Sequence, residues 1–385
     1  MAERVAVIGV GLTKFGELWT KGIRDLAIEA GAKAMEDANM NSKDIDAMYV
    51  GNMSAGRFAG QEHLNALIAD QIGLTIPSTR VEGACASGSL AVREGMFSIL
   101  AGQHDIVLVG GAEKMSDVST AHATTGLMGA ADEEWEGFHG LTFPGLYALM
   151  AKKHMHDFRT TREQLASPAI KNHHNATMNP IAQFSFEITT EKVINATMVA
   201  DPLTLLDCSP ISDGAAAIIL ARESVARKYT DTPVFIDGTG LSTDALALHD
   251  RRTLTALDAA VRASKRAYEM AGVTAKDIQV AEVHDCFTIA EIMAIEDLGF
   301  FKKGEGGKAT MDGETQIGGK VSVNTSGGLK GAGHPVGATG IKQAAEIVMQ
   351  LRGDIGKRQV SGAEVGLTHN VGGSGATAVV NIFKR

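Results

Sequence analysis

Cysteine is scarce in this chain of 385 residues, which contains only Cys85, Cys208 and Cys286. The three lie far apart and none belongs to a Cys-x-x-Cys pair, so their spacing excludes a disulfide framework and a zinc site built on such pairs. Free thiols are typical of proteins in a reducing compartment. We therefore expect a cytoplasmic protein without a resident metal.

Long apolar runs and an excess of positive charge are also absent. No stretch of about 20 apolar residues occurs, as a membrane helix would need, and the chain reaches Val5-Ala-Val-Ile without the features of a signal peptide. The formal net charge of −9 argues against broad nucleic-acid binding. This net charge does not exclude binding of anionic ligands, because a local positive patch can attract them. We expect neither membrane nor nucleic acid among the partners.

Glycine, with 44 residues, and apolar residues, at 44% of the chain, are plentiful. The glycines follow no G-X-Y period, so they indicate tight turns and not collagen. Gly9-Val-Gly11 resembles the start of a dinucleotide-binding fingerprint, but Lys14 stands where that fingerprint needs a third glycine. The length allows two or three domains with a large core.

The chain contains an internal repeat. An apolar stretch ending in Gly-x-Gly begins at Val5 and again at Val234, an alanine-rich stretch follows each, and Lys-Asp-Ile at 43–45 recurs at 276–278. Self-similarity of this kind indicates repeated structural units, and strands that alternate with helices indicate α/β layers. We predict two similar α/β halves with the active groups at the seam between them.

The first half of the repeat is interrupted. The stretch ending at Gly102 matches the one ending at Gly353 at an offset of 251, whereas the stretch from Asp213 matches the one from Ser374 at an offset of 161. About 90 extra residues therefore lie between Gly102 and Asp213. The predicted division has three parts: a first half of 1–115 and 200–228, an inserted loop domain of 116–199, and a second half of 229–385.

Cys85 stands in Gly-Ala-Cys-Ala-Ser-Gly, where an apolar stretch passes through small residues into an amphipathic helix. The free N–H groups and the dipole at a helix N-terminus favour the thiolate, which is the nucleophilic form of cysteine. The small neighbours leave space for a substrate. A buried cysteine in a tight strand-to-helix junction is an equally good interpretation of this stretch alone.

A histidine occupies nearly the same place in the second half. His334 lies in Gly-Ala-Gly-His-Pro-Val-Gly, and the offset of 251 places it opposite position 83, close to Cys85. If the halves are related by a pseudo-twofold axis, both helix starts face one cleft, and His334 can take the proton of Cys85. Otherwise this glycine-rich stretch forms only a turn that caps the next helix.

Two further segments carry histidine or cysteine at strand ends. His284 and Cys286 alternate in Glu-Val-His-Asp-Cys-Phe, so in a strand both point to the same side. A thiol there can act as acid or base and an imidazole can donate to an oxyanion, although both residues would also fit a satisfied core. His369 opens His-Asn-Val-Gly-Gly, whose backbone N–H groups could bind an anion.

Together these segments resemble the thiolase superfamily over nearly the whole chain, and within it the archaeal and sterol-carrier-protein-type acetyl-CoA C-acetyltransferases. The resemblance rests on five motifs: Ala-Cys-Ala-Ser-Gly around Cys85, His-Asp-Cys-Phe from His284, Asn-Thr-Ser-Gly-Gly-Leu from Asn324, Gly-His-Pro-Val-Gly around His334, and His-Asn-Val-Gly-Gly from His369. It implies the α/β thiolase fold, with two pseudo-symmetric halves in five layers (α-β-α-β-α) and an inserted loop domain.

The resemblance also implies roles for these residues. Cys85 is the nucleophile that becomes acylated, and His334 activates it and helps to hold the thioester oxygen. His284 supports that first oxyanion hole, where most thiolases place an asparagine. Many thiolases carry an acid/base cysteine on the last loop, but this chain has His369 there, so Cys286 is the base and His369 supports it. The N–H groups of Cys85 and of the turn after His369 form a second hole.

Binding of coenzyme A is assigned to two groups of residues. The first comprises small residues of the motifs: Ser326, Gly327, Gly333, Val371 and Gly372. The second comprises candidate phosphate contacts, although such side chains usually lie solvated on the surface: Lys152, Lys153, Arg251 and Arg252.

The implied reaction condenses two acetyl-CoA molecules to acetoacetyl-CoA and CoA, or runs in reverse as thiolysis. Coenzyme A thioesters are the substrates and no cofactor is permanently bound. A 3-ketoacyl-CoA thiolase of lipid degradation is the alternative. A 3-hydroxy-3-methylglutaryl-CoA synthase would use a glutamate base and a ketoacyl synthase a second histidine or asparagine, which leaves Cys286 unexplained. Non-catalytic acyl-CoA-binding or retro-aldolase relatives usually lose the cysteine that Cys85 represents here.

The resemblance extends to partners. Thiolases are commonly homodimers or homotetramers. Archaeal relatives are coupled to 3-hydroxy-3-methylglutaryl-CoA synthase through a small zinc-ribbon and OB-fold protein, in mevalonate and isoprenoid synthesis. We expect the same surroundings for this chain.

Overall fold

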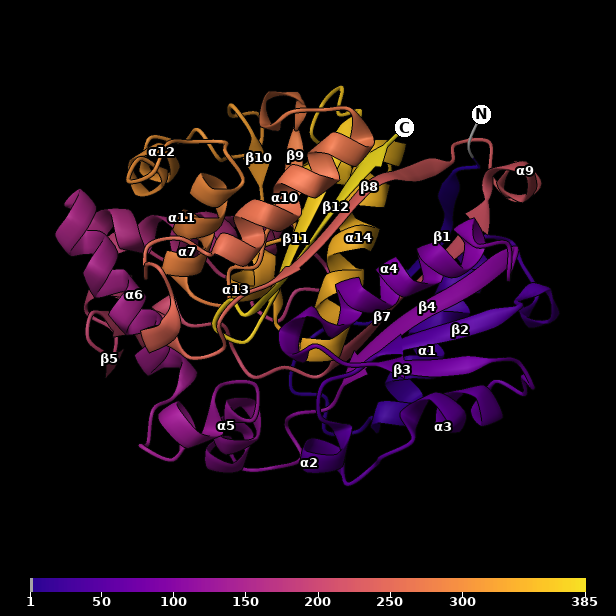
Figure 1. Ribbon diagram of the computed structural model, residues 1–385, viewed down its shortest axis with the longest axis horizontal. Helices are drawn as coiled ribbons and strands as arrows, with labels where there is room; N and C mark the ends of the chain where they lie inside the picture. Colours follow the sequence, from indigo (N-terminus) through magenta and orange to yellow (C-terminus); the bar gives the residue numbers. More distant parts are fainter. Residues whose placement is uncertain (1–2) are drawn as a thin grey trace.

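Ten strands form one large mixed sheet whose order repeats on either side of its centre. The computed structural model describes residues 3–385, and the sheet runs β10-β9-β11-β12-β8-β1-β7-β4-β2-β3 (Figure 1). Outward from the centre, β1, β7, β4, β2 and β3 on one side correspond to β8, β12, β11, β9 and β10 on the other. The ten strands are β1 (Val5–Leu12), β2 (Ala47–Gly51), β3 (Ser78–Val81), β4 (Ile106–Glu113), β7 (Gly214–Arg222), β8 (Val234–Thr243), β9 (Val280–Glu282), β10 (Ser322–Val323), β11 (Val365–Gly372) and β12 (Thr377–Lys384).

The two halves of the sheet meet at a narrow junction. β1 and β8 pair only at Ala6 with Phe235 and at Val7 with Val234. By contrast, β1 pairs with β7, and β8 with β12, along nearly their whole lengths. The chain therefore forms two α/β halves with the same strand order, as the repeat predicts.

One alanine-rich helix covers the outer face of each half. These helices are α1 (Ile23–Asp37) and α10 (Asp258–Ala271). A Cβ atom on Gly11 of β1 would overlap the backbone of α1, and one on Gly240 of β8 would overlap the backbone of α10. The Gly-x-Gly strands and the alanine-rich helices of the repeat thus let strand and helix approach closely.

Two helices lie between the halves, and Figure 1 shows them near the middle of the molecule. They are α4 (Ser87–Leu100) and α14 (Val336–Arg352). They touch backbone to backbone, because a Cβ on Gly88 would come within 3.1 Å of the backbone of Gly337, Gly340 and Ile341. The layers are therefore outer helix, strands, central helices, strands and outer helix.

The chain between β4 and β7 adds no strand to the large sheet. It folds mainly into helices and one small two-stranded sheet. Its helix α7 packs against three helices of the second half, α11 (Thr288–Asp297), α12 (Gly306–Met311) and α13 (Gly328–Ala332). Its elements are α5 (Thr120–Met128), α6 (Phe143–Phe158), α7 (Arg162–Thr177), α8 (Thr190–Ile194), β5 (Met198–Ala200) and β6 (Leu203–Thr204). We propose that this segment is the inserted loop domain expected over 116–199.

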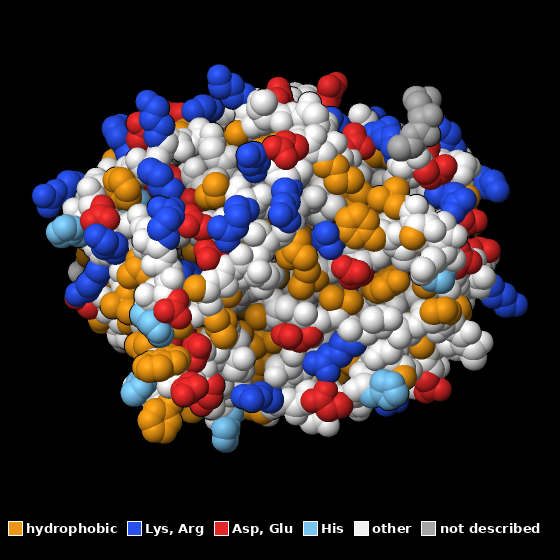
Figure 2. Space-filling view, viewed as in Figure 1, with side chains coloured by type: hydrophobic (Ala, Val, Ile, Leu, Met, Phe, Trp, Pro, Cys, Tyr) orange, Lys and Arg blue, Asp and Glu red, His pale blue; other side chains and the backbone are white. Residues whose placement is uncertain are grey.

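The other helices are short or lie at the edges of the halves. They are α2 (Ala55–Ala59), α3 (Leu64–Gln71), α9 (Glu223–Ala226), α11 (Thr288–Asp297), α12 (Gly306–Met311) and α13 (Gly328–Ala332). Among the described residues, no helix combines the length and the apolar character that crossing a bilayer requires. On the face shown in Figure 2, acidic and basic side chains are interspersed.

Candidate active site

Cys85 lies at the entrance to the central helix α4. It belongs to a single 3₁₀ turn (Ala84–Ala86) between β3 and α4. Ala84 has a left-handed φ of 54°, which is strained for a residue with a side chain. Ser87 holds the turn, because its hydroxyl accepts from the N–H of Gly83 (3.0 Å) and donates to the carbonyl of Ala84 (2.6 Å).

His334 stands at the corresponding entrance to α14. It follows α13 and precedes Pro335, the N-cap of α14. Its backbone N–H donates to Ser212 Oγ at 2.9 Å. Gly333 makes this turn with a φ of 107°, and a Cβ there would be about 3.0 Å from Ser212 Oγ. The pairing of the two helix starts that the repeat predicts therefore places His334 beside Cys85.

The structure brings Cys85, His284 and His334 together. The sulfur of Cys85 and one ring nitrogen of each histidine lie within 4.8 Å of one another, and all three residues are buried. The two imidazole rings meet edge to face, at 86° and 5.1 Å between centroids. A thiol and two imidazoles thus meet at the seam between the halves.

This cluster opens into a mostly apolar pocket of about 710 Å³, counted with its mouth. Both halves and the segment between β4 and β7 line it, and all three cysteines of the chain belong to its wall. The lining residues are Cys85, Met115, Thr124, Leu127, Phe143, Pro144, Tyr147, Cys208, Ser209, Pro210, Ile211, Cys286, Phe287, His334 and Gly373. A pocket of this kind suits a small acyl group next to the Cys85 sulfur.

Burial keeps the Cys85–His334 pair neutral. It raises the pKa of Cys85 to about 12, with a smaller contribution from the carboxylate of Glu113, and lowers the pKa of His334 to about 3, helped by the charge of Lys342. The helix start therefore does not produce the resting thiolate that the sequence suggests, because desolvation of the charge outweighs it. The proton must leave Cys85 as the substrate is attacked.

The hydrogen bonds of His334 define which of its nitrogens is the base. Nδ1 lies 2.7 Å from Thr339 Oγ1, and Thr339 donates its own hydroxyl proton to the carbonyl of Pro335 at 2.9 Å. Thr339 can therefore only accept from His334, so Nδ1 carries the proton. The lone pair on Nε2 remains for the thiol of Cys85.

Cys286 lies on the loop between β9 and α11, on the wall of the same pocket. Burial raises its pKa well above the usual range, and the neighbouring Tyr147 hydroxyl opposes this only in part. The Tyr147 ring stacks on Phe287 at 4.6 Å, and its hydroxyl donates to the carbonyl of Gly373 at 3.2 Å. The segment between β4 and β7 thus positions Cys286 through Tyr147.

His369 is part of strand β11 and lies behind His284. Its Nδ1 accepts a long hydrogen bond, 3.5 Å, from the backbone N–H of His284, and burial lowers its pKa to about 4. Its ring therefore contacts the backbone of the His284–Cys286 loop, whereas the Cys286 thiol interacts with Tyr147. Support of Cys286 by His369 remains a proposal, and it would act through this loop.

The turn after β11 reaches the nucleophile. The backbone of Gly373 lies beside the Cys85 sulfur and opposes the rise in the pKa of this thiol. A Cβ on the neighbouring Gly372 would come within 2.5 Å of the carbonyl of Gly83. Only glycine therefore fits at this end of β11, where its backbone contacts the turn that contains Cys85. Val371, by contrast, is buried in the hydrophobic core.

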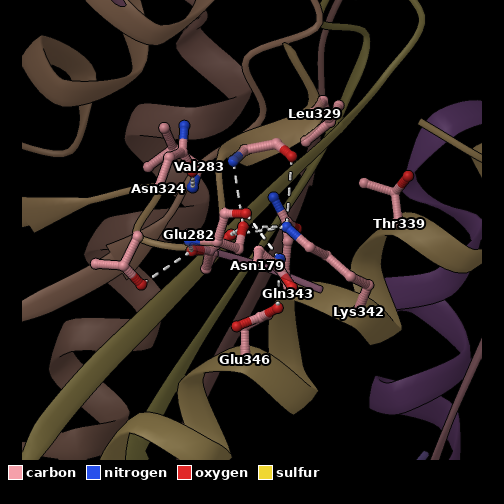
Figure 3. A network of polar contacts seen from close by, with 12 residues as sticks. Asn179, Glu282, Val283, Asn324, Leu329, Thr339, Lys342, Gln343 and Glu346 are labelled. Atoms are coloured by element: carbon pink, nitrogen blue, oxygen red, sulfur yellow. Dashed lines mark hydrogen bonds and ion pairs between the residues drawn. The ribbon is translucent and has the colours of Figure 1, made fainter. Parts of the chain in front are cut away.

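Ser326 and Gly327 lie in the interior and outside the pocket lining. Ser326 donates to Glu282 at 2.5 Å and also contacts Lys342, and Lys342 pairs with Glu282 at 3.0 Å (Figure 3). A Cβ on Gly327 would overlap Ala176 of α7. Ser326 therefore belongs to the polar network around Glu282 and Gly327 to the contact with α7, and contact with CoA stays a prediction for both.

The four candidate phosphate contacts all have protein partners. Lys152 pairs with Asp201, Lys153 with Asp157 at 2.8 Å, and Arg252 with Asp258 at 2.5 Å. Arg251 donates to the backbone of the β11–β12 turn at Ser374, at 2.5 Å. Arg251 thus braces the turn that carries Gly373.

Cysteine and two histidines also form a donor set of the kind that binds zinc. His334 has the tautomer of a metal ligand, with Nδ1–H donated and Nε2 free. In His284, Nδ1 lies 3.0 Å from Asn370 Nδ2 and so already has a protein partner.

Sequence reasoning missed three contributors: Tyr147, Thr339 and Asn370. Thr339 and Asn370 stand inside motifs whose histidines were singled out, but their spacing does not reveal which ring nitrogen they contact. Tyr147 lies some 140 residues from Cys286 in the sequence. No local pattern connects the two.

Comparison with known proteins places this architecture in a family. The family model "Thiolase, N-terminal domain" matches residues 5–224, and "Thiolase C-terminal domain-like" matches residues 240–385. The acetyl-CoA acetyltransferases of Methanothermobacter thermautotrophicus and Methanocaldococcus jannaschii are 59% and 50% identical, with 99% and 98% of each chain covered. Human sterol carrier protein 2 is 37% identical over 99% of this chain and 72% of its own length.

Solved structures share the fold. An Ltp2-ChsH2(DUF35) aldolase superposes with a TM-score of 0.86 at 24% identity, covering 99% of this chain and 97% of its own. Human mitochondrial 3-ketoacyl-CoA thiolase in complex with CoA gives 0.77 at 18%, covering 100% and 98%. These findings confirm the resemblance and the fold predicted from the sequence, and the chain belongs to the thiolase family.

Proposed function

We propose that this protein is an acetyl-CoA acetyltransferase that condenses two acetyl-CoA molecules to acetoacetyl-CoA and CoA, or catalyses the reverse thiolysis, through an acyl group on Cys85. The observation that carries the proposal is the meeting of Cys85, His334 and His284 within 4.8 Å beside a pocket that also contains Cys286. The names of the two archaeal relatives, at 59% and 50% identity, support the choice of reaction.

In the first step the Cys85 sulfur attacks the thioester carbon of acetyl-CoA while its proton passes to Nε2 of His334. The carbonyl oxygen becomes negative and accepts a hydrogen bond from the protonated nitrogen of His284. The bond from carbon to the CoA sulfur then breaks. Cys286 gives its proton to the departing CoA thiolate, so CoA leaves as a thiol and Cys286 remains as a thiolate.

In the second step the Cys286 thiolate removes a methyl proton from a new acetyl-CoA. The carbanion equivalent attacks the acetyl carbon on Cys85, whose oxygen turns toward the N–H groups of Cys85 and Gly373. The Cys85–carbon bond breaks, and the cysteine regains the proton that His334 held. Acetoacetyl-CoA leaves, and both thiols are restored.

The setting follows from the resemblance. Condensation is thermodynamically uphill, so its product must be withdrawn by a following reaction. We propose a cytoplasmic oligomer that feeds mevalonate and isoprenoid synthesis, coupled to 3-hydroxy-3-methylglutaryl-CoA synthase. Size measurement and co-purification with that enzyme test this part separately from the chemistry.

The test of the chemistry separates the two steps. After incubation with acetyl-CoA, mass spectrometry should find one acetyl group on the Cys85 peptide, and none in Cys85→Ala. Cys286→Ala should still acquire the acetyl group but lose condensation and thiolysis. The absence of an adduct in the wild type would overturn the acyltransferase proposal, and equal loss of both steps in Cys286→Ala would overturn the division of labour.

A further inference from the structure

Two neutral imidazoles stand side by side at the nucleophile, and the proposed reaction needs them to do opposite things. The rings of His284 and His334 meet edge to face with their centroids 5.1 Å apart. One must accept the proton of Cys85 and the other must donate to the thioester oxygen. A neutral imidazole does either, depending on which nitrogen carries its proton.

His284 has one side-chain partner among the described residues that bears on this choice. Its Nδ1 lies 3.0 Å from Asn370 Nδ2, and its Nε2 is buried without a hydrogen-bond partner in the part of the chain that the structure describes. An amide NH₂ group only donates. Nδ1 must then accept, which leaves the proton on Nε2.

The other side of the Asn370 amide faces α4. Asn370 Oδ1 and the N–H and hydroxyl of Ser89, the third residue of α4, all lie around the point where a Cβ on Gly340 would sit. Neither Asn370 Oδ1 nor Ser89 Oγ has a hydrogen-bond partner in the part of the chain that the structure describes. The orientation of the amide therefore rests on the contact of its NH₂ group with Nδ1 of His284.

We propose that Asn370 is a positioning residue that holds His284 in the Nε2–H tautomer, so that His284 is a hydrogen-bond donor while His334 is the base. The inference rests on the proposed function. Asn370 on β11 thereby fixes the orientation of the proposed oxyanion donor, His284. Without the Asn370 amide, either nitrogen of His284 can carry the proton. In the wrong tautomer, the Nε2 lone pair would face the thioester oxygen and could donate no hydrogen bond to it.

Removal of the amide tests the proposal kinetically. Asn370→Leu should lower kcat for acyl transfer about 10²–10³-fold, the cost of one oxyanion donor, while KM changes less than about threefold. The same substitution in a His284→Asn background should change kcat less than about threefold, because an amide donor has no tautomer. An equal loss in both backgrounds would show that Asn370 only supports the fold, and would overturn the proposal.

A direct readout does not depend on activity. In protein with ¹⁵N-labelled histidine, the signals that disappear in His284→Asn identify His284, and their shifts should show Nε2 protonated and Nδ1 bare. Asn370→Asp should reverse this pattern, because a carboxylate can only accept from Nδ1–H. Nδ1 protonated in the wild type would refute the inference.

The failure of this inference is distinguishable from failure of the proposed function. Normal acetylation of Cys85 with His284 protonated on Nδ1 would contradict only the role of Asn370. A His284 protonated on Nε2 in a protein that is not acetylated would contradict the acyltransferase proposal and leave the positioning of His284 intact. Asn381→Leu is the matched control, because it removes a buried amide that accepts a hydrogen bond from the Thr239 hydroxyl at 2.7 Å. It should lower the stability of the protein without changing the shifts of the His284 nitrogens.

Discussion

The two central helices occupy equivalent places in the two halves, yet they do different work. The residues of α4 that correspond to one face of α14 by the offset of 251 are small or apolar: Gly88, Ala91, Val92 and Gly95. The corresponding face of α14 carries polar and charged side chains (Figure 3): Thr339, Lys342, Gln343 and Glu346. A symmetric scaffold therefore holds an asymmetric site.

The difference follows from what each half must supply. A nucleophile needs space for its substrate, and small residues around Cys85 provide it. A base and an oxyanion donor need fixed orientations. Thr339 therefore orients His334, Lys342 anchors Glu282 at the strand that leads to His284, and Gln343 donates to the carbonyl of His369 at 3.1 Å. Positioning, and not only presence, of the histidines is what the second half contributes.

The largest effect should come from the base. His334→Ala removes the acceptor for the Cys85 proton, so the rate of acetylation of Cys85 should fall about 10²–10⁴-fold. Rapid-quench mass spectrometry of the Cys85 peptide measures it. His104→Ala, on the loop before β4, is the control and should be unchanged. A loss below tenfold would mean that His334 is not the base, and that the difference between the two halves does not serve catalysis.

The charged network of α14 is the next target. Lys342→Met leaves the carboxylate of Glu282 buried without its cation, since both side chains are about 1% exposed. The free energy of unfolding should fall by about 3–5 kcal/mol, as measured in urea. The double variant Lys342→Met, Glu282→Gln removes the stranded charge and should recover much of the loss. No recovery would show that the loss does not come from the stranded charge.

The contact between the central helices should be intolerant of a single methyl group. A Cβ on Gly340 would overlap the backbone of Ser89 and the amide of Asn370. Gly340→Ala should therefore cost about 3 kcal/mol. Gly31→Ala in α1 is the matched control, because nothing lies within 4 Å of its new Cβ, and it should stabilise by about 0.5–1 kcal/mol. Similar outcomes for both would contradict the close contact.

A smaller effect distinguishes His369 through pH. Its pKa is about 4 in the folded protein against about 6.5 unfolded, so on acidification the unfolded chain takes the proton first and the folded state loses stability. Between pH 7 and pH 5 this amounts to about 2 kcal/mol. His369→Gln should remove that part of the acid sensitivity in urea titrations, whereas the exposed His122→Gln should not. An unchanged pH slope would contradict the burial of a neutral His369.

Much of the site could be read before the fold was known. The offset of 251 between the halves places His334 near Cys85, because repeated units that pack symmetrically bring equivalent helix starts together. The alternation of His284 and Cys286 predicts a common direction within a strand, but β9 ends at Glu282 and both residues lie on the loop that follows. The resting thiolate expected for Cys85 does not form, because burial of the thiol raises its pKa more than the helix start lowers it. Burial depends on residues such as Tyr147 that lie far away in the chain.

The family and the two-part architecture could be read from the sequence, because motifs and the period of a repeat specify them. The same motifs predict Cys85 as the nucleophile and His334 as the base. Only the tertiary structure decided the protonation states and tautomers. Those depend on which distant groups surround each ring: Thr339 for His334 and Asn370 for His284. Burial and hydrogen-bond partners are properties of packed neighbours, and no local pattern of residues specifies them.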